Sequence, residues 1–182
     1  SPDELVAQAA EVRVLNENWA DKGVDFRLFH GNECDILPDG GLDYTDEERS
    51  LLDHVVGSVH QLPTWMKRDE DVNTEALIRA IENPSLTILG HPTGRILGGR
   101  DGFAVDLHAV LRRMGELNAE GELKVVEINA SPYRLDLDWR YCRYAKEQGV
   151  PISINPDAHT QQGLKDVWFG AQIARKGWLE KT

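Results

Sequence analysis

Two kinds of apolar segment alternate along this chain, and the alternation restricts the folds open to it. Short runs rich in Val, Ile, Leu and Phe are typical of buried strands, and they occur at 26–29, 55–59, 86–89, 124–128 and 152–154. Stretches with apolar residues at helical spacing separate them, at 5–22, 76–81, 105–117, 139–148 and 164–175. Strands that alternate with helices of about ten residues are joined by crossovers, which produce a parallel sheet covered by helices. The predicted fold class is therefore α/β.

Capping and breaking residues mark the ends of several of these segments. Thr45-Asp-Glu-Glu48 has the pattern of a capping box, which predicts a short helix through Leu51 and Leu52. Asn83-Pro84 closes the helix at 76–81, because a residue before proline avoids the helical conformation. The widest stretch without a periodic pattern is 61–73, which predicts a loop beside whatever site exists.

Length and composition restrict the class of protein further. The 182 residues suit one domain, and 41% hydrophobic with 28% charged residues is a globular profile. No apolar run approaches the ~18 residues of a membrane span, and two cysteines fit a reducing compartment, so the predicted location is cytoplasmic. The net charge of −11 argues against a free-standing nucleic-acid binder. It is compatible with an enzyme whose bound cations reverse the local field.

Titratable side chains recur where the predicted strands end. Because parallel α/β folds bind ligands at the carboxyl ends of their strands, these positions are the candidate site. The residues found there are Glu33, His60, His91, Glu127, Asn129, Asp157 and His159. They follow one another at roughly one βα unit, about 30 residues, so they are expected to converge. Imidazoles and carboxylates at one edge predict a mixed N/O site suited to zinc, manganese or iron.

Each candidate also has a plain structural interpretation. A single histidine is more often a satisfied core or surface residue than a ligand, and only the joint pattern favours a metal. His54 and His108 serve as controls, because one lies at the opposite edge and the other inside a helix. His30 ends its predicted strand and stays open as a ligand.

Three further residues near the strand ends have roles beside the ligands. Glu127 faces the interior and must be paired, which favours a supporting or substrate-orienting role over direct ligation. Arg95 and Arg134 fall in loops at the same edge, where arginine suits bidentate phosphate contact. A surface salt bridge in an acidic protein is an equally good interpretation of each arginine.

Several motifs resemble the later motifs of the polymerase and histidinol phosphatase (PHP) superfamily. The segments are Gly31-Asn-Glu-Cys-Asp-Ile-Leu37, Ser58-Val-His60, Gly90-His-Pro-Thr-Gly-Arg95, Glu127-Ile-Asn-Ala130 with Arg134-Leu-Asp-Leu137, and Asn155-Pro-Asp-Ala-His159. The run at 90–95 and the closing Ala174-Arg-Lys-Gly-Trp-Leu179 look most like the PHP domain at the C-terminus of bacterial family X DNA polymerases. The resemblance extends from about Leu5 to Leu179.

The resemblance implies a fold, a metal site and an activity. The fold would be a partial distorted (β/α)7 TIM-like barrel of the PHP type, with parallel strands and outer helices. Up to three divalent metals, manganese or zinc and alternatively iron, would be held by Glu33, His60, His91, Asp157 and His159. Glu33, His60 and Asp157 would be catalytic, and Arg95, Arg134 and Asn129 would bind substrate. The implied activity is metal-dependent phosphate-ester hydrolysis, similar to a 3′-to-5′ exonuclease acting on DNA beside an attached polymerase.

One departure from the family pattern changes these expectations. The family opens with a His-x-His pair and then an Asp-His pair, and no His-x-His occurs in this sequence. We therefore expect 1–182 to be a single PHP domain that is N-terminally incomplete by two βα units. An open barrel edge predicts a homodimer, strand exchange or a separate N-terminal fragment as partner. The alternatives are a stand-alone phosphatase of the histidinol-phosphatase type and a non-catalytic structural domain.

Overall fold

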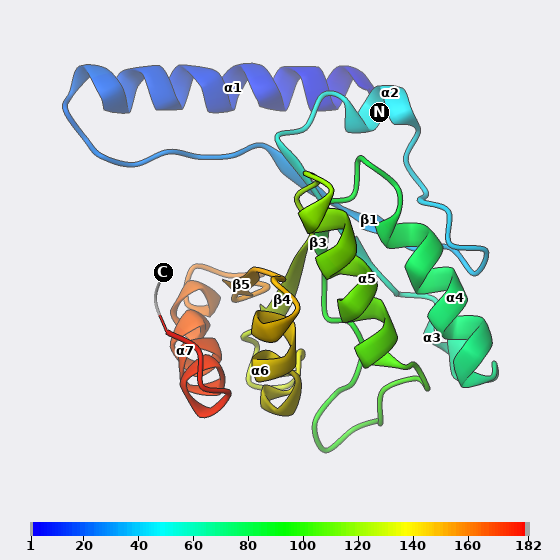
Figure 1. Cartoon of the computed structure of the whole chain (residues 1–182). Helices are drawn as coiled ribbons and strands as arrows, with labels where there is room; N and C mark the ends of the chain where they lie inside the picture. Colours follow the sequence, from blue (N-terminus) through cyan, green and yellow to red (C-terminus); the bar gives the residue numbers. More distant parts are fainter. Residues whose placement is uncertain (1, 181–182) are drawn as a thin grey trace.

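A sheet of five parallel strands runs through the molecule in chain order, β1-β2-β3-β4-β5 (Figure 1). The computed structural model describes residues 2–180. The strands are β1 (Gly31–Asp35), β2 (His54–Ser58), β3 (Ile88–Leu89), β4 (Val125–Asn129) and β5 (Ile152–Asn155). The predicted α/β class with a parallel sheet is confirmed, and it is compatible with part of a TIM-like barrel.

Helices precede, connect and follow the strands. They are α1 (Pro2–Asp21), α2 (Asp46–Arg49), α3 (Leu62–Trp65), α4 (Glu70–Ile81), α5 (Leu107–Ala119), α6 (Trp139–Glu147) and α7 (Val167–Lys176), with a 3-10 turn at Gly163–Asp166. Figure 1 shows α4, α5, α6 and α7 side by side across the sheet in chain order. None of the helices within residues 2–180 is long and apolar enough to cross a membrane.

The hydrophobic core lies between the sheet and this helix layer. Leu77 and Ile81 of α4, Leu111 and Met114 of α5, and Ile128 of β4 are fully buried in one cluster. Burying each such side chain stabilises the fold by about 1.5–3 kcal/mol, so this layer fixes the sheet on which the site is built.

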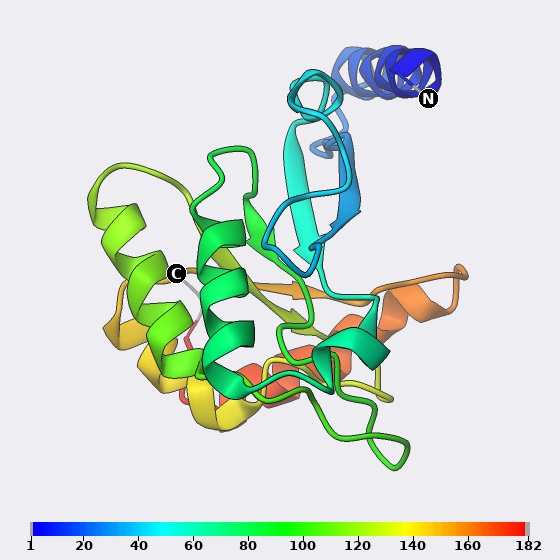
Figure 2. The same ribbon diagram turned by 90° about the vertical axis from the view of Figure 1, so that its right-hand side faces the viewer.

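The long helix α1 lies apart from that core. None of its residues is buried, and Figures 1 and 2 show it displaced from the sheet and joined to β1 by the 22–30 segment. The Asn16 side chain exchanges two hydrogen bonds with the backbone of Leu28, at 2.9 and 2.8 Å. The main contacts of α1 are thus with its own connecting segment.

Two sequence predictions are wrong, and both errors have physical reasons. Residues 26–29 form no strand, because their backbone bonds to Asn16 and Phe26 packs edge-on against Trp19, while the strand begins at Gly31. The 61–73 stretch contains α3 and the start of α4 rather than a loop. There the Asn73 amide donates to the carbonyls of Trp65 and Ala104, at 2.9 Å each, which fixes both helices.

The predicted capping box at the start of α2 is confirmed. The Thr45 hydroxyl accepts a hydrogen bond from the Glu48 amide at 3.2 Å, and the Glu48 carboxylate accepts one from the Thr45 amide at 2.9 Å. Two backbone donors that the helix itself leaves free are thereby satisfied.

Candidate metal centre

Three of the predicted ligands meet at one point near the ends of neighbouring strands. Glu33 lies in β1, His60 follows β2 and His91 follows β3. One carboxylate oxygen of Glu33, Oε1, lies 3.4 Å from Nε2 of His60 and 3.2 Å from Nε2 of His91. The three ligand atoms fall within 4.8 Å of one another, and we call these residues the Glu/His cluster.

Gly90 allows the chain to turn towards this cluster. A Cβ atom at this position would lie 2.3 Å from Oγ of Ser58 and 2.8 Å from the Val56 side chain. Only glycine fits where β3 ends so close to β2. His91 follows with φ of +22°, a backbone conformation that the surrounding contacts must hold.

Glu127 holds the backbone of His91 from the neighbouring strand β4. Its Oε2 accepts a hydrogen bond from the His91 amide at 2.7 Å, and its Oε1 accepts one from the Asn155 side chain of β5 at 2.9 Å. Burial raises the pKa of this carboxyl, against the lowering effect of the two hydrogen bonds. Glu127 lies outside the Glu/His cluster and supports it instead.

Asp136 holds the same segment two residues further on. Its Oδ2 accepts hydrogen bonds from the amide and hydroxyl of Thr93, at 3.0 and 2.9 Å, and its side chain is fully buried. Burial raises the pKa of Asp136, as it does for Glu127. Two buried carboxylates therefore fix the ends of the segment that carries His91.

Asp35 orients His60, and sequence reasoning missed it. The Asp35 carboxylate contacts Nδ1 of His60, which leaves Nε2 directed at Glu33. Carboxylates that bond the second nitrogen of a ligating histidine fix its tautomer and orientation. The signal was available in the sequence, because Glu33 and Asp35 are two residues apart in one strand and so share a face.

The cluster is strongly polarised. Hydrogen bonds from His60 and His91 hold the pKa of Glu33 far below its ordinary value. The hydrogen bond to Glu33 raises the pKa of His60 to about 9, against the effect of burial. At neutral pH the cluster therefore combines a carboxylate with an imidazolium, and a bound cation would take the place of that proton.

The donor set fits a divalent transition metal. Two imidazole nitrogens and one carboxylate oxygen are ligands that zinc, manganese and iron accept. His91 is 2% exposed, and its Nδ1 is buried without a hydrogen-bond partner, so Nε2 is the atom it presents to the cluster. The geometry thus supports a site for a divalent metal at the Glu/His cluster.

Asp157 and His159 lie outside this cluster in the described chain. The Asp157 carboxylate accepts a hydrogen bond from the Asn129 side-chain amide at 3.1 Å and lies 3.7 Å from Nε of Arg134. The His159 side chain is 86% exposed, and its Nδ1 lies 2.9 Å from the Asp157 carbonyl oxygen. Of the five expected ligands, the structure brings three together and leaves these two on the far side of β4.

The three expected substrate residues are engaged within the protein. Arg95 pairs with Asp138 at 2.7 Å and also donates to the backbone carbonyls of Arg134 and Leu135. Arg134 lies beside Asp157, and Asn129 is 1% exposed. The contacts of Arg95 match the salt-bridge alternative.

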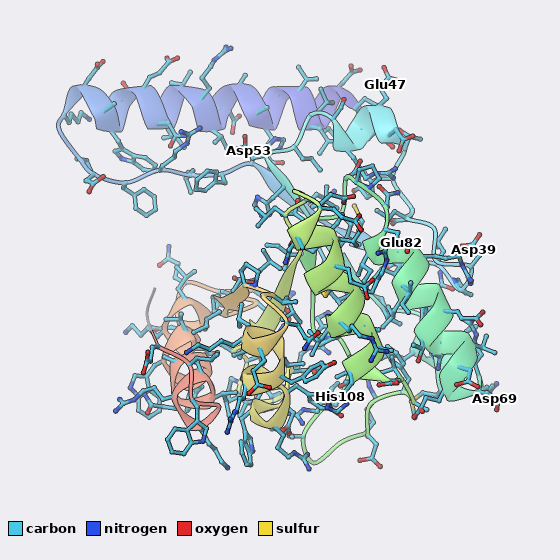
Figure 3. All side chains as sticks on the ribbon, in the orientation of Figure 1. Asp39, Glu47, Asp53, Asp69, Glu82 and His108 are labelled. Atoms are coloured by element: carbon cyan, nitrogen blue, oxygen red, sulfur yellow. The ribbon has the colours of Figure 1, made fainter. Side chains whose placement is uncertain are left out.

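His30, which the sequence left open as a ligand, and the two control histidines lie outside the Glu/His cluster. His30 is buried, with ring nitrogens 3.0 Å from Gln8 Oε1 and 3.3 Å from the Leu51 carbonyl oxygen. His54 begins β2, at the amino end of the sheet. His108 lies on α5 (Figure 3), with its ring centroid 5.1 Å from that of Tyr141 and 4.7 Å from that of Tyr144 on α6.

Comparison with known proteins gives the chain several relatives. It is 38% identical over 178 residues to the DNA polymerase/3′-5′ exonuclease PolX of Bacillus subtilis, an overlap of 98% of this chain and 29% of that protein. It is 31% identical to a probable phosphatase of a Thermoanaerobacter species, over 72% of this chain and 52% of the relative. A probable phosphatase of Clostridium acetobutylicum is 29% identical, over 74% of this chain and 53% of the relative. No family model matches the chain.

Proposed function

We propose that the chain is a domain of the PHP superfamily, of the kind found in bacterial family X DNA polymerases, and that it is a metal-dependent phosphoesterase. The observation that carries the proposal is the Glu/His cluster, whose three ligand atoms lie within 4.8 Å of one another. The chain spans 29% of the PolX relative and about half of the phosphatases, so their activities come to it only as proposals.

The roles of the residues follow from their contacts. Glu33 lies between two imidazoles and would hold a cation through its carboxylate, while His60 and His91 would each present Nε2. A bound metal would supply a water with a pKa of about 7 and would neutralise charge on the phosphate oxygens. Asp35, Glu127 and Asp136 keep the two imidazoles in place.

We retain Asp157 and His159 as ligands of a further cation. Asp157 is already held in position by Asn129 and Arg134, and His159 is exposed next to it. Manganese or zinc, with iron as the alternative and up to three ions in total, remains the proposed complement. Asp157 stays a proposed catalytic residue with Glu33 and His60. Arg134 and Asn129, which both contact Asp157, stay proposed substrate-binding residues.

DNA is the proposed substrate, hydrolysed from a 3′ end beside an attached polymerase domain. The overlap with the exonuclease PolX along nearly all of this chain supports this choice. The second candidate is a small phosphate monoester, supported by the probable phosphatases. A cytoplasmic location, a single domain and a homodimer belong to the same proposal.

Metal analysis and hydrolysis by matched variants test the proposal. The purified chain is expected to bind manganese or zinc and to hydrolyse a 3′-labelled oligonucleotide or a small phosphate ester. His91→Ala should abolish hydrolysis and lower the metal content, while His108→Ala should preserve both because His108 lies on α5. His159→Ala should lower the metal content without removing it. Equal metal content in His91→Ala, His108→Ala and the unmodified chain would overturn the site, and metal binding without hydrolysis would favour a structural domain.

A further inference from the structure

A pocket is formed by the loop that follows His91 of the Glu/His cluster. It is a pocket of about 630 Å³ between the loop at 93–105 and the first turns of α5 and α6. Its lining begins at Thr93, two residues after His91 and bonded to Asp136. Figure 2 shows this loop, in green, extending below the sheet. The volume is within the range of small-molecule sites, about 300–1,000 Å³.

The floor of the pocket is apolar, and its rim carries both positive and negative side chains. Phe103 and Leu107 are 3% and 2% exposed, and Phe103 packs against Trp65 with ring centroids 5.1 Å apart. Arg95, Arg100 and Arg140 line the pocket together with Glu70, Asp101 and Asp138. Charges are therefore balanced here, in a chain whose net charge is −11. An anionic ligand meets less repulsion at this site than the average surface offers.

The three arginines differ in how fully the protein uses them. Arg95 is committed to Asp138 and to two backbone carbonyls. Arg140 contacts only Asp138 among the described residues, and its side chain is 69% exposed. Arg100 donates from Nε to the Gly94 carbonyl at 3.2 Å and is exposed. Arg100 and Arg140 thus retain N–H groups for a ligand.

An exposed aromatic ring adjoins the same loop. The Leu97 amide donates to the Tyr133 carbonyl at 2.7 Å, so the loop that lines the pocket lies against Tyr133. The Tyr133 residue is 73% exposed, and the next residue, Arg134, lies 3.7 Å from Asp157. Tyr133 is therefore bonded through its backbone to the pocket loop and is followed in the chain by Arg134, the neighbour of Asp157.

We propose that this pocket and Tyr133 form a binding site for a nucleotide next to the one that is hydrolysed. The base would stack on Tyr133 or lie on the apolar floor, and Arg100 and Arg140 would bind its phosphodiester. The inference rests on the proposed function and selects between its two substrates. A small phosphate monoester needs only the metal centre, whereas an oligonucleotide extends beyond it into the pocket.

Binding and hydrolysis measured separately test the site. Binding of a fluorescent ten-residue oligothymidylate is followed by anisotropy in EDTA, which prevents hydrolysis. Hydrolysis is followed on the same oligonucleotide and on bis-p-nitrophenyl phosphate with manganese. Arg100→Ala/Arg140→Ala and Tyr133→Ala are each expected to weaken binding about tenfold and to raise KM for the oligonucleotide. The rate on the small ester should not change.

The control is Arg143→Ala, which removes a guanidinium from the same helix. Arg143 is 75% exposed and pairs with Glu147 on α6, one turn beyond Arg140. It should leave binding and both rates unchanged. Arg140→Lys keeps the charge and should recover part of the binding if circular dichroism shows that the alanine variants fold.

Each outcome bears on one claim. Unchanged oligonucleotide binding in both pocket variants, or no binding by the unmodified chain, overturns the pocket even if the small ester is hydrolysed. An equal loss of the small-ester reaction in the pocket variants would also overturn it. If the unmodified chain hydrolyses neither ester, the proposed function is overturned instead, whether or not the oligonucleotide binds.

Discussion

Glu127 carries a carboxylate that is 5% exposed and accepts hydrogen bonds from two different strands' ends. Glu127→Gln keeps the shape of the side chain, but its NH2 group would face either the His91 backbone amide or the Asn155 side-chain amide, which are both donors. We expect a loss of about 1–3 kcal/mol in the free energy of unfolding, because a buried donor loses its acceptor. Manganese affinity should fall with it, since the backbone of His91 is released. Urea unfolding and a metal titration measure the two effects.

The matched control for Glu127 is Glu116→Gln on α5. The Glu116 side chain is 52% exposed and contacts Arg113 on the protein surface. Its substitution should change neither quantity by more than about 0.5 kcal/mol, as is usual for exposed sites. Equal effects of the two substitutions would contradict a positioning role for Glu127.

The two cysteines are expected to be chemically inert in the folded chain. Burial raises the pKa of the Cys34 thiol to about 12 and that of Cys142 to about 11. Only the thiolate reacts, so little of either residue is reactive at neutral pH. Ellman's reagent should detect no thiol in the native chain and both thiols after unfolding in guanidinium chloride. Rapid reaction of either cysteine before unfolding would show that its surroundings are open.

At the scale of elements, the start of α6 depends on one carboxylate. Asp138 accepts a hydrogen bond from the Arg140 amide and pairs with the side chains of Arg95 and Arg140. Partial burial raises its pKa, but these hydrogen bonds outweigh the burial and leave the pKa below its ordinary value of 3.8. A depressed folded pKa stabilises the fold above the unfolded value and ceases to do so as the pH falls through the folded value.

Asp138→Asn removes the charge but keeps the helix cap, because the asparagine side chain still accepts a hydrogen bond from the Arg140 backbone amide. We expect this variant to lose about 1–3 kcal/mol of stability at pH 7, the range for hydrogen bonds to charged groups. Its free energy of unfolding should also fall less steeply than that of the unmodified chain as the pH drops from 5 to 3. Urea unfolding at several pH values measures this difference, and parallel curves would contradict the ion-pair role.

Helix α1 is expected to be the first part of this chain to open. It has no buried side chain, and a helix without packing is only marginally stable in water. Brief trypsin digestion should cut after Arg13, Lys22 or Arg27 before any site beyond residue 30. The remaining fragment should keep the metal affinity and the melting temperature of the full chain. Early cleavage within α4 or α5 would contradict this order.

Strand and helix positions follow from the sequence wherever burial decides them. The helices at 105–117 and 139–148 and the strand at 124–128 are confirmed, because their apolar residues enter the single core. The 26–29 segment has a similar apolar pattern, yet Phe26 and Phe29 are 57% and 60% exposed. Periodicity cannot distinguish a strand from an extended segment held by a polar side chain such as Asn16.

The candidate site is less predictable than the fold. Strand order brings Glu33, His60 and His91 together, and that order follows from the βα alternation. The distance between Asp157 and the cluster depends on sheet curvature and on the loop after β5, which residue spacing does not encode. Asp136 acts through two hydrogen bonds to Thr93 that residue spacing does not encode, whereas the position of Asp35 beside Glu33 follows from their spacing in one strand.

For the whole molecule, the net charge of −11 should limit the salt dependence of nucleic-acid binding. Two phosphate contacts, at Arg100 and Arg140, predict a slope of about −1.4 for the logarithm of the association constant against the logarithm of salt concentration. Anisotropy of the oligothymidylate complex in EDTA at several NaCl concentrations measures this slope. A slope near −5 would indicate a basic binding surface that the proposed site does not contain.

The Glu/His cluster and the two carboxylates that hold the His91 segment come from different halves of the chain. All three candidate ligands precede β4, whereas Glu127 and Asp136, which hold His91, follow the start of β4. A cation bound by the cluster is therefore thermodynamically linked to the docking of β4 on β3. Linkage is reciprocal, so the docking raises the affinity for the cation by the same factor by which the cation favours the docking. The ion would therefore stabilise the association of the two halves of the chain although it contacts only the first.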